Sequence, residues 1–293
     1  MQNASQSRGR TGQPSQTALT AAAARAAHPI VDAEPLIFTD PLAARLLGER
    51  AEELIAYHRR RGDHPVLAGA RTQVTLRSRY AEERVADALD RGVTQYVILG
   101  AGLDSFGYRS PLADRLRVFE VDHSASQRWK RDRLADAGIP VPGTVHLVPV
   151  DFETDALTER LADGGFDPSR PAVVSWLGVT LYLTRAAIDA TLAEVCRWAP
   201  GTEIVLDYPL SPELRDAAGR AYAEAVAGFA AERGEPWRSV FTPGDLAALL
   251  ARHGFTVVEQ AHQRDLGPWD RADALRPAEL SVLVHARLAR AAR

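Results

Sequence analysis

Two glycines follow directly on an apolar stretch, and their spacing could bring a ligand against the main chain. Val97–Leu99 is apolar and partly β-branched, which predicts a strand, and Gly100-Ala101-Gly102 comes next. Glycine has no Cβ, so a ligand can lie close to the backbone at such a turn. A tight turn without a ligand would have the same composition, and the glycines alone leave both interpretations open.

An acidic residue follows the glycines at a suggestive distance. Asp122 ends the predicted strand 118–121 and lies twenty residues beyond Gly102. In nucleotide-binding α/β folds, a carboxylate at about this distance accepts hydrogen bonds from the ribose hydroxyls. The glycines and Asp122 together favour a nucleotide ligand, with a solvated carboxylate at a strand end as the alternative.

The end of the third predicted strand bears on which nucleotide would bind. Strand 145–150 is followed by Asp151-Phe152, a carboxylate that could accept from an adenine amino group and a ring that could support the purine. A dinucleotide-binding turn has Gly or Ala where this chain has Ser105. These residues favour an adenosine over a nicotinamide dinucleotide, although a Phe152 buried in the core would explain the pair equally.

The overall composition argues against several classes of protein. The chain has 293 residues, a formal net charge of −3 and one cysteine, Cys196. A basic nucleic-acid-binding surface and a disulfide framework are therefore not expected. No apolar run approaches the roughly 20 residues that span a bilayer, and no signal peptide is evident. We expect a cytoplasmic protein with no nucleic-acid or membrane partner and no metal, and we interpret His123 beside Asp122 as a loop histidine.

From residue 96 onward, short strands alternate with helices. The predicted strands are 96–99, 118–121, 145–150, 172–176, 203–207, 256–259 and 281–286. This alternation is typical of a doubly wound α/β fold, in which helices cover both faces of a mostly parallel sheet. Ser124, Thr154, Thr184 and Thr242 mark the expected N-terminal ends of the helices between these strands, with Ser124 and Thr242 as caps.

Two further regions do not follow this alternation. Residues 17–90 are helical in pattern and precede the first strand, and 211–241 is a helical insertion after the fifth strand. We expect both to cover a ligand at the carboxyl ends of the strands. The polar residues 1–16 predict a disordered tail. The rest, 17–293, is then one domain whose core is 91–210 and 242–293.

The motifs, in their order and spacing, resemble the leucine carboxyl methyltransferase family. The matching stretches are Gly100-Ala-Gly-Leu-Asp-Ser, Phe119-Glu-Val-Asp122, Asp151-Phe152 and Trp176-Leu-Gly-Val-Thr-Leu-Tyr182-Leu. Upstream of them, the stretches Arg25-Ala-Ala-His28, Asp40-Pro41-Leu42-Ala43 and Arg77-Ser-Arg79-Tyr80 also fit. The family includes protein phosphatase methyltransferases and many bacterial small-molecule methyltransferases, and the resemblance covers residues 17 to about 210.

The resemblance implies an S-adenosylmethionine-dependent enzyme with a seven-stranded, Rossmann-like sheet. It places Gly100 and Gly102, with Ala101 between them, under the methionine part of the cofactor. It also places Asp122 at the ribose, with His123 beside it, and Asp151 with Phe152 at the adenine. S-adenosyl-L-methionine is the expected cofactor.

The family also implies an arginine before the first strand that holds the cofactor carboxylate, and two arginines compete for this role. Arg77 borders an apolar helical stripe, whereas Arg79 points away from it. The stripe consists of Val74, Ser78, Ala81, Val85 and Ala88. We therefore choose Arg77. Arg25 matches a second basic residue that can reach the same carboxylate.

The fourth-strand motif departs from the family at one position. Many members have a glutamate directly before Gly178, whereas this chain has Leu177. Leu177 remains a candidate cofactor neighbour through its backbone position, but a polar contact from its side chain is lost. Tyr182 on the same loop and Tyr208 after the fifth strand are the candidates for the side of the methyl acceptor.

The favoured chemistry is methyl transfer to a carboxylate of a small molecule or a peptide end. A carboxylate is ionised near neutral pH and needs no general base, and no acid–base constellation is evident in the sequence. Methylation of a hydroxyl or phenol, a nicotinamide-dependent oxidoreductase and a non-catalytic cofactor-binding protein are the alternatives. The sequence leaves homodimer formation open.

Overall fold

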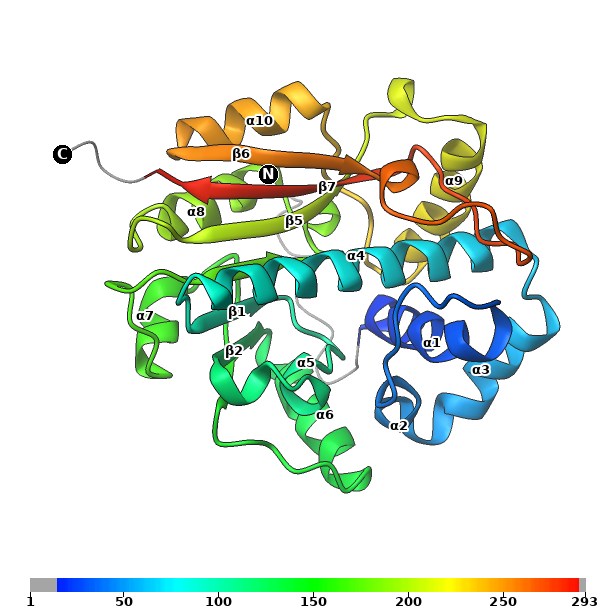
Figure 1. Cartoon of the computed structure of the whole chain (residues 1–293), viewed down its shortest axis with the longest axis horizontal. Coiled ribbons are helices and arrows are strands. Elements are labelled where there is room, and N and C mark those ends of the chain that lie inside the picture. The colour runs from blue at the N-terminus through cyan, green and yellow to red at the C-terminus, as the bar shows by residue number, and fades with distance from the viewer. Residues whose placement is uncertain (1–14, 290–293) are drawn as a thin grey trace, which may run out of the picture.

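Seven strands form one mixed sheet in the computed structural model, which describes residues 15–289 (Figure 1). The strands are β1 (Gln95–Leu99), β2 (Arg117–Asp122), β3 (Val145–Pro149), β4 (Val173–Trp176), β5 (Glu203–Pro209), β6 (Phe255–His262) and β7 (Ser281–Leu288). They lie in the order β3-β2-β1-β4-β5-β7-β6. Strands β1 to β5 are parallel, and β7 is antiparallel to both of its neighbours. The predicted doubly wound, mostly parallel sheet of seven strands is confirmed.

Helices connect the strands and make up most of the segment before β1. The α-helices are α1 (Gln16–Val31), α2 (Ala43–Leu47), α3 (Ala51–Arg60), α4 (Pro65–Asp90), α5 (Phe106–Arg109), α6 (Ser124–Asp136), α7 (Leu157–Asp163), α8 (Arg185–Val195), α9 (Ala217–Glu232) and α10 (Pro243–Arg252). The 3-10 helices are η1 (Gly48–Arg50), η2 (Ala113–Arg115), η3 (Thr180–Tyr182), η4 (Pro212–Leu214) and η5 (Gln263–Asp265). Within residues 15–289, no helix is both long and apolar enough to cross a membrane.

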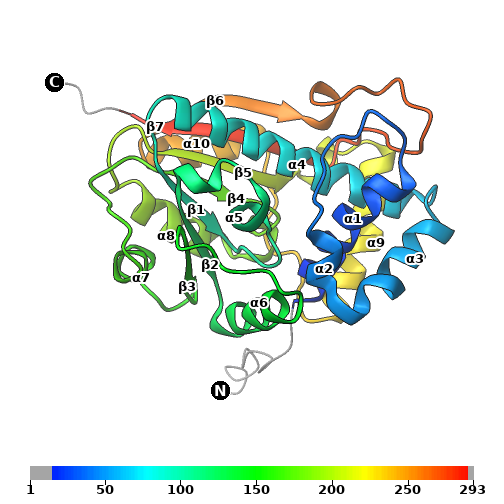
Figure 2. The same cartoon turned by 60° about the horizontal axis from the view of Figure 1, so that its bottom comes forward.

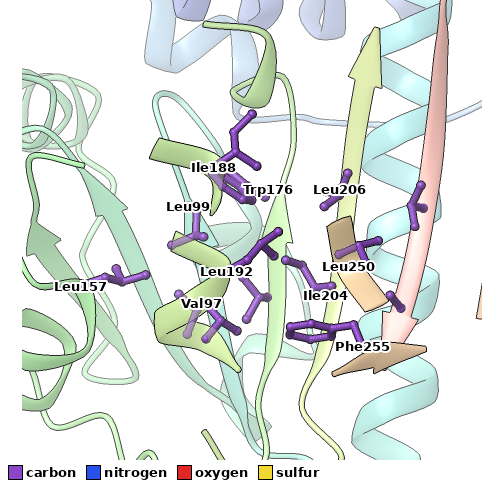
Figure 3. Close-up of a cluster of buried hydrophobic side chains, with 14 of the residues drawn as sticks. Val97, Leu99, Leu157, Trp176, Ile188, Leu192, Ile204, Leu206, Leu250 and Phe255 are labelled. Atoms are coloured by element: carbon purple, nitrogen blue, oxygen red, sulfur yellow. The ribbon is translucent and has the colours of Figure 1, made fainter. Parts of the chain in front are cut away.

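Strand β1 lies inside the sheet, between β2 and β4, and is buried on both faces. All five of its residues are buried, as expected for a parallel strand covered by helices. Val97 and Leu99 point to the face covered by α8 and α10, where they join the core cluster of Figure 3. Tyr96 and Ile98 point to the other face and contact α4 and α5 residues. This alternation follows from the two-residue period of a strand.

The strand order reverses beside β1, which pairs with β2 on one side and β4 on the other. In doubly wound sheets, ligands bind at the carboxyl ends of the strands at such a point. Leu99 pairs with Val121, so Gly100 and Asp122 lie next to each other at the carboxyl ends of β1 and β2. Figure 1 and Figure 2 show α1, α2, α3 and α9 gathered at this end of the sheet.

The N-terminal boundary differs from the sequence prediction. Residues 1–14 of the predicted tail lie outside the described residues, but Ser15 caps a helix that Gln16 begins. The Ser15 Oγ accepts a hydrogen bond from the Ala18 amide at 3.2 Å, and Gln16 begins α1. A serine at an N-cap satisfies an amide that has no partner within the helix, so the helical segment begins at its cap.

Three of the four predicted N-terminal ends can be compared directly with the observed helix ends. Thr184 and Thr242 cap α8 and α10, and each hydroxyl accepts an amide hydrogen bond at 3.1 Å. These two predictions are confirmed. Ser124 is instead the first residue of α6, and His123 is the cap: its Nδ1 accepts from the Ala125 amide at 3.2 Å.

Thr154 precedes a helix that ends at Gly164, as expected, but it does not cap that helix. Helix α7 begins at Leu157, because the backbone from Asp151 to Asp155 first forms a turn of its own. The exposed amides of Leu157 and Thr158 donate to the carboxylate of Glu194 in α8, at 3.0 and 2.7 Å. The cap therefore comes from a residue distant in the sequence.

Candidate active site

A cavity of about 440 Å³ opens at the carboxyl ends of the central strands, a size that suits a small molecule. What we call the strand-end wall comes from the segments that follow β1, β2 and β3: Leu99, Gly100, Ala101, Gly102, Leu103, Asp104, Asp122, His123, Ser126, Trp129, Val150, Asp151, Phe152 and Glu153. What we call the helical wall comes from α1, α4, α9 and their flanks: Ser15, Thr17, Ala18, Thr20, Ala21, Arg25, Ala70, Gln73, Val74, Arg77, Ser78, Tyr222, Val226, Phe229 and Trp237. The loop after β4 adds Leu177, Gly178, Val179, Leu181, Tyr182 and Leu183.

The glycine turn after β1 needs its glycines for two reasons. Gly100 and Gly102 have φ angles of 69° and 46°, a region that side chains with a Cβ rarely adopt. A Cβ on Gly100 would lie 2.4 Å from Cγ2 of Val179, which follows β4. The amides of Gly100 and Ala101 donate to the Val121 carbonyl at 2.8 and 3.0 Å. The turn is thus held rigidly between β2 and the β4 loop.

Asp122 is fixed in place by two backbone amides. Its Oδ2 accepts from the Gly102 amide at 2.7 Å, and its Oδ1 accepts from the His123 amide at 2.7 Å. A carboxylate has about four lone-pair sites, so both oxygens can accept a further hydrogen bond from a ligand in the cavity. The side chain of His123 lines the cavity next to it, with its Nδ1 engaged in the α6 cap.

Asp151 and Phe152 line the strand-end wall beyond Asp122. The Asp151 Oδ1 accepts from the Glu153 amide at 3.0 Å, and the Asp151 amide donates to Asp155 at 2.9 Å. Phe152 is half-buried and also packs against the main core cluster. Phe152 thus contacts the core and also lines the cavity.

The structure separates the two competing arginines of α4. Arg77 lines the cavity, and its Nη1 lies 3.5 Å from Oδ2 of Asp207. Arg79 does not line it; its Nη2 donates to the Leu266 carbonyl and its Nε lies 3.6 Å from Glu83. The helix phase expected from the apolar stripe therefore brings Arg77, and not Arg79, to the cavity.

Arg25 lines the cavity, and its side-chain hydrogen bonds support the glycine turn. Its Nε donates to Asp40 at 2.9 Å and its Nη2 donates to the Leu103 carbonyl at 2.6 Å. Burial alone would raise the pKa of Asp40, but the charges of Arg25 and Arg109 outweigh it and hold that pKa below its usual range. Arg25 thus ties α1 to the segment that follows Gly102.

A carboxylate not expected from the sequence lies beneath the β4 loop. Oδ1 of Asp207, near the end of β5, accepts from the Gly178 amide at 2.5 Å, and its other oxygen faces Arg77. The Arg77 guanidinium in turn occupies the space that a Cβ on Gly178 would need. Leu177 lines the cavity and packs against a small apolar cluster that includes Ala81. The sequence signal that could have indicated Asp207 is its position as an acidic residue at the end of a predicted strand.

Tyr182 is placed at the cavity, and Tyr208 is not. Tyr182 lies in η3 and lines the cavity. Tyr208 is only 1% exposed, donates to Oε1 of Gln260 at 3.0 Å and packs on Phe241. Neighbouring strand residues point to opposite faces, so Asp207 faces Arg77 while Tyr208 faces the core. We therefore withdraw Tyr208 as a candidate for the acceptor side.

Four cavity residues were missed because they lie in the segment with the weakest pattern. Tyr222, Val226 and Phe229 belong to α9, and Trp237 follows it. Their sequence positions show one usable signal: Tyr222, Val226 and Phe229 repeat at intervals of four and three, which places them on one helical face.

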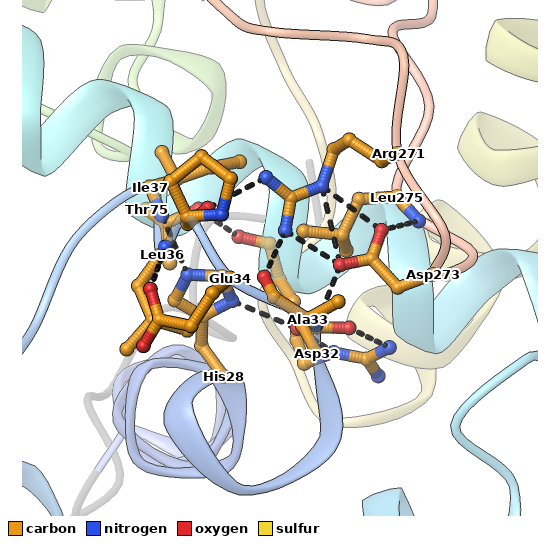
Figure 4. A network of polar contacts seen from close by, with 12 residues as sticks. His28, Asp32, Ala33, Glu34, Leu36, Ile37, Thr75, Arg271, Asp273 and Leu275 are labelled. Carbon is orange, nitrogen blue, oxygen red and sulfur yellow. Dashed lines mark hydrogen bonds and ion pairs between the residues drawn. The ribbon is translucent and has the colours of Figure 1, made fainter.

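His28 is held in a polar network and does not reach the cavity. Its Nε2 accepts from the Ile37 amide at 3.0 Å, so the ring proton is on Nδ1, which contacts Asp32 at 2.8 Å. Figure 4 shows this network joining the end of α1 to Arg271 and Asp273. His28 is fully buried and is not among the residues that line the cavity.

The chain is similar in sequence to methyltransferases. The sequence profile of the family described as leucine carboxyl methyltransferase matches residues 18–196. A Bacillus subtilis (strain 168) protein, provisionally named S-adenosyl-L-methionine-dependent methyltransferase YktD, is 34% identical over 303 residues, covering 94% of this chain and 99% of that protein. A Mycobacterium tuberculosis (strain ATCC 25618 / H37Rv) protein with the same provisional description is 35% identical over 209 residues, covering 68% of this chain and 65% of that protein. These relatives favour S-adenosylmethionine over a nicotinamide cofactor.

Solved structures with the same fold include two bacterial proteins. A Thermobifida fusca YX protein, provisionally described as a methyltransferase, superposes with a TM-score of 0.55 at 18% identity, covering 95% of this chain and 96% of that one. A DUF574 family protein from Streptomyces avermitilis superposes with a TM-score of 0.55 at 17% identity, covering 90% and 96%. At these identities the likeness concerns the fold, which is that of the Rossmann-like methyltransferases.

Proposed function

Because this chain belongs to the leucine carboxyl methyltransferase family and is an S-adenosylmethionine-dependent methyltransferase, we propose that it methylates an oxygen atom, and that this oxygen belongs to the carboxylate of a small molecule. S-adenosylmethionine supplies the activated methyl group, and the products are a methyl ester and S-adenosylhomocysteine. The protein has to orient the acceptor and exclude water.

The strand-end wall has groups that complement each part of the cofactor. The glycine turn offers close access to the backbone, Asp122 has free acceptor sites for the ribose hydroxyls, and Asp151 with Phe152 would hold the adenine. Arg77 is the candidate for the carboxylate, because its guanidinium lines the cavity and its contact with Asp207 orients it. A planar guanidinium can bind a carboxylate through two hydrogen bonds.

The distribution of bases around the cavity carries the proposal. Among the described residues that line it, every Asp, Glu and His belongs to the strand-end wall. The helical wall and the β4 loop contribute none, so the groups able to remove a proton lie on the wall assigned to the cofactor. A phenol, with a reference pKa near 10, would need such a base, whereas a carboxylate, with a reference pKa near 4, is already ionised.

Tyr182 does not fill the role of base. Burial raises the pKa of its phenol, and the nearby charge of Glu235 raises it further. Its hydroxyl therefore stays protonated near neutral pH and can donate a hydrogen bond or orient an acceptor. His28 does not fill this role either, because its ring is held between Ile37 and Asp32.

The experiment that tests the proposal uses cofactor labelled in the methyl group, with panels of carboxylic acids and phenols as acceptors. The expected product is an ester that mild alkali hydrolyses, formed at a rate nearly independent of pH between about 6 and 8. A label that survives alkali, or a rate that rises about tenfold per pH unit, would contradict carboxylate methylation and leave the methyltransferase assignment intact.

A further inference from the structure

Helix α9 presents an aromatic stripe to the cavity. Tyr222, Val226 and Phe229 repeat at intervals of four and three, and all three line the cavity together with Trp237 just beyond the helix. Side chains at this spacing lie above one another on one helical face. The aromatic side chains of the helical wall therefore come from one short segment of the chain, residues 222–237.

A different stripe of α9 holds the helix on the protein. Gly219, Ala223 and Ala230 are its buried residues. The approach at Gly219 is so close that a Cβ there would lie 2.2 Å from the carbonyl oxygen of Glu279. Phe229, in contrast, remains 38% exposed. Tyr222 of the aromatic stripe also packs on α4. Phe229 has the Arg233 guanidinium 3.5 Å from its ring centre and keeps the rest of its exposed apolar surface available to a ligand.

The ring of Tyr222 has a fixed place on this wall. It packs on Gly69 of α4, where a Cβ would lie 2.8 Å from Cδ2 and 3.0 Å from Cε2. A glycine inside a long helix costs about 1 kcal/mol relative to alanine, and here it makes room for the ring. Burial raises the pKa of the Tyr222 phenol, so the side chain stays neutral.

Both cationic side chains that line the helical wall already have partners or an assigned role. The basic residues of the helical wall are Arg25 and Arg77, of which Arg25 is bonded to Asp40 and Leu103. Arg77 is assigned to the cofactor carboxylate. The aromatic stripe and Trp237 therefore face the part of the acceptor that carries no charge.

We infer that the acceptor is an aromatic carboxylic acid whose ring lies against Phe229, Tyr222 and Trp237. This inference rests on the proposed carboxylate methylation and adds the class of molecule that bears the carboxylate. Aromatic rings prefer offset or edge-to-face contact with other rings, which adds to simple apolar burial. A planar ring should therefore bind better than a saturated ring of the same carbon count, even though the saturated ring has more apolar surface.

The test compares 3-phenylpropanoate with 3-cyclohexylpropanoate and hexanoate as ligands of the full chain saturated with S-adenosylhomocysteine. Calorimetry should give 3-phenylpropanoate the lowest Kd, by about fivefold or more over the cyclohexyl acid. Phe229→Leu keeps apolar area but removes the ring, and it should abolish this preference. Tyr57→Ala removes an aromatic side chain that is 54% exposed and does not line the cavity, so it should leave the preference unchanged.

The outcomes separate this inference from the proposed function. Absence of 3-phenylpropanoate binding, equal binding of the saturated acid, or an unchanged preference in Phe229→Leu would each overturn the aromatic assignment. Ester formation from labelled cofactor with aliphatic acids would then still support carboxylate methylation. An alkali-stable product from phenols would overturn the carboxylate and therefore both proposals. If Phe229→Leu does not fold, Trp237→Leu serves as the second variant with the same expected loss.

Discussion

The two walls of the cavity are built in different ways. The strand-end wall combines glycine backbone with carboxylates that stand where consecutive strands leave one sheet. The helical wall has no carboxylate among its described lining residues, contributes two arginines and three aromatic side chains, and combines α1, α4 and α9, which are far apart in sequence. The first can recognise a cofactor that does not vary, while the second can change its side chains without disturbing the sheet. Substitutions should therefore separate cofactor affinity from acceptor preference.

The largest expected effect concerns the sheet that both walls share. Burial alone would raise the pKa of Glu203, but hydrogen bonds from His285 and Arg91 and the charge of Arg287 outweigh it and lower the pKa from 4.5 to about 2. The carboxylate therefore stabilises the fold above pH about 4.5, by about 3 kcal/mol. This contribution is lost as the pH falls toward 2.

Glu203→Gln should thus lower the free energy of unfolding by about 3 kcal/mol at pH 7, because it removes the buried anion that His285, Arg91 and Arg287 contact. Chemical denaturation at pH 7 and at decreasing pH measures this. Glu49→Gln, at an exposed position in η1, is the matched control and should change stability little. A variant with wild-type stability at pH 7 would show that the Glu203 cluster does not hold β5 and β7 together.

The second prediction concerns a residue of the helical wall that we assign to the cofactor, Arg77 of α4. Arg77→Ala should raise the Kd for S-adenosylmethionine by about 100-fold, and Arg77→Lys should restore little because lysine lacks the two-pronged geometry. Calorimetric titration measures both.

Arg79→Ala is the matched control for Arg77, since Arg79 lies two residues away and does not line the cavity. Its Kd for the cofactor should stay within about twofold of wild type. Equal losses at the two positions would mean that α4 acts on the cofactor site through its stability alone.

The third prediction tests the strand-end wall itself. Asp122→Ala should weaken S-adenosylmethionine binding by about 2 kcal/mol, roughly 30-fold, because hydrogen bonds to a charged group are lost. Asp132→Ala, an exposed carboxylate in α6, should have no comparable effect. Unchanged cofactor affinity in folded Asp122→Ala would place the ribose elsewhere.

The smallest expected effect belongs to the helical wall. Gly69→Ala should displace the Tyr222 ring and raise the Kd for 3-phenylpropanoate about threefold to tenfold, with cofactor affinity unchanged. Gly228→Ala, in α9 with nothing near the added Cβ, is the matched control and should leave both affinities as they are. A change in cofactor affinity for Gly69→Ala would mean that the two walls are coupled.

Much of the strand-end wall could be predicted from the sequence. Gly100, Gly102, Asp122, Asp151 and Phe152 all line the cavity. Each lies at or just after a strand end, and parallel strands bring such positions to one edge of the sheet. The face of α4 that turns toward the cavity could also be predicted, because the apolar residues of a helix repeat with a fixed period.

The helical wall and the supporting contacts depended on tertiary structure. Tyr208 was misplaced because the sequence did not show which side of β5 faces the cavity. Asp207, the Glu194 cap of α7 and the aromatic stripe of α9 all act on residues distant in the chain. Local periodicity carries no information on which helix docks on which.

The amino-acid sequence by itself determined the sheet, its glycine turn and the strand-end carboxylates, because these follow from local pattern and from the rule that parallel strands end together. Only the tertiary structure decided which side chains close the cavity. That choice depends on how α1, α4 and α9 pack through small residues such as Gly69 and Gly219. Close approach at those points is a property of two surfaces, and neither segment specifies it alone.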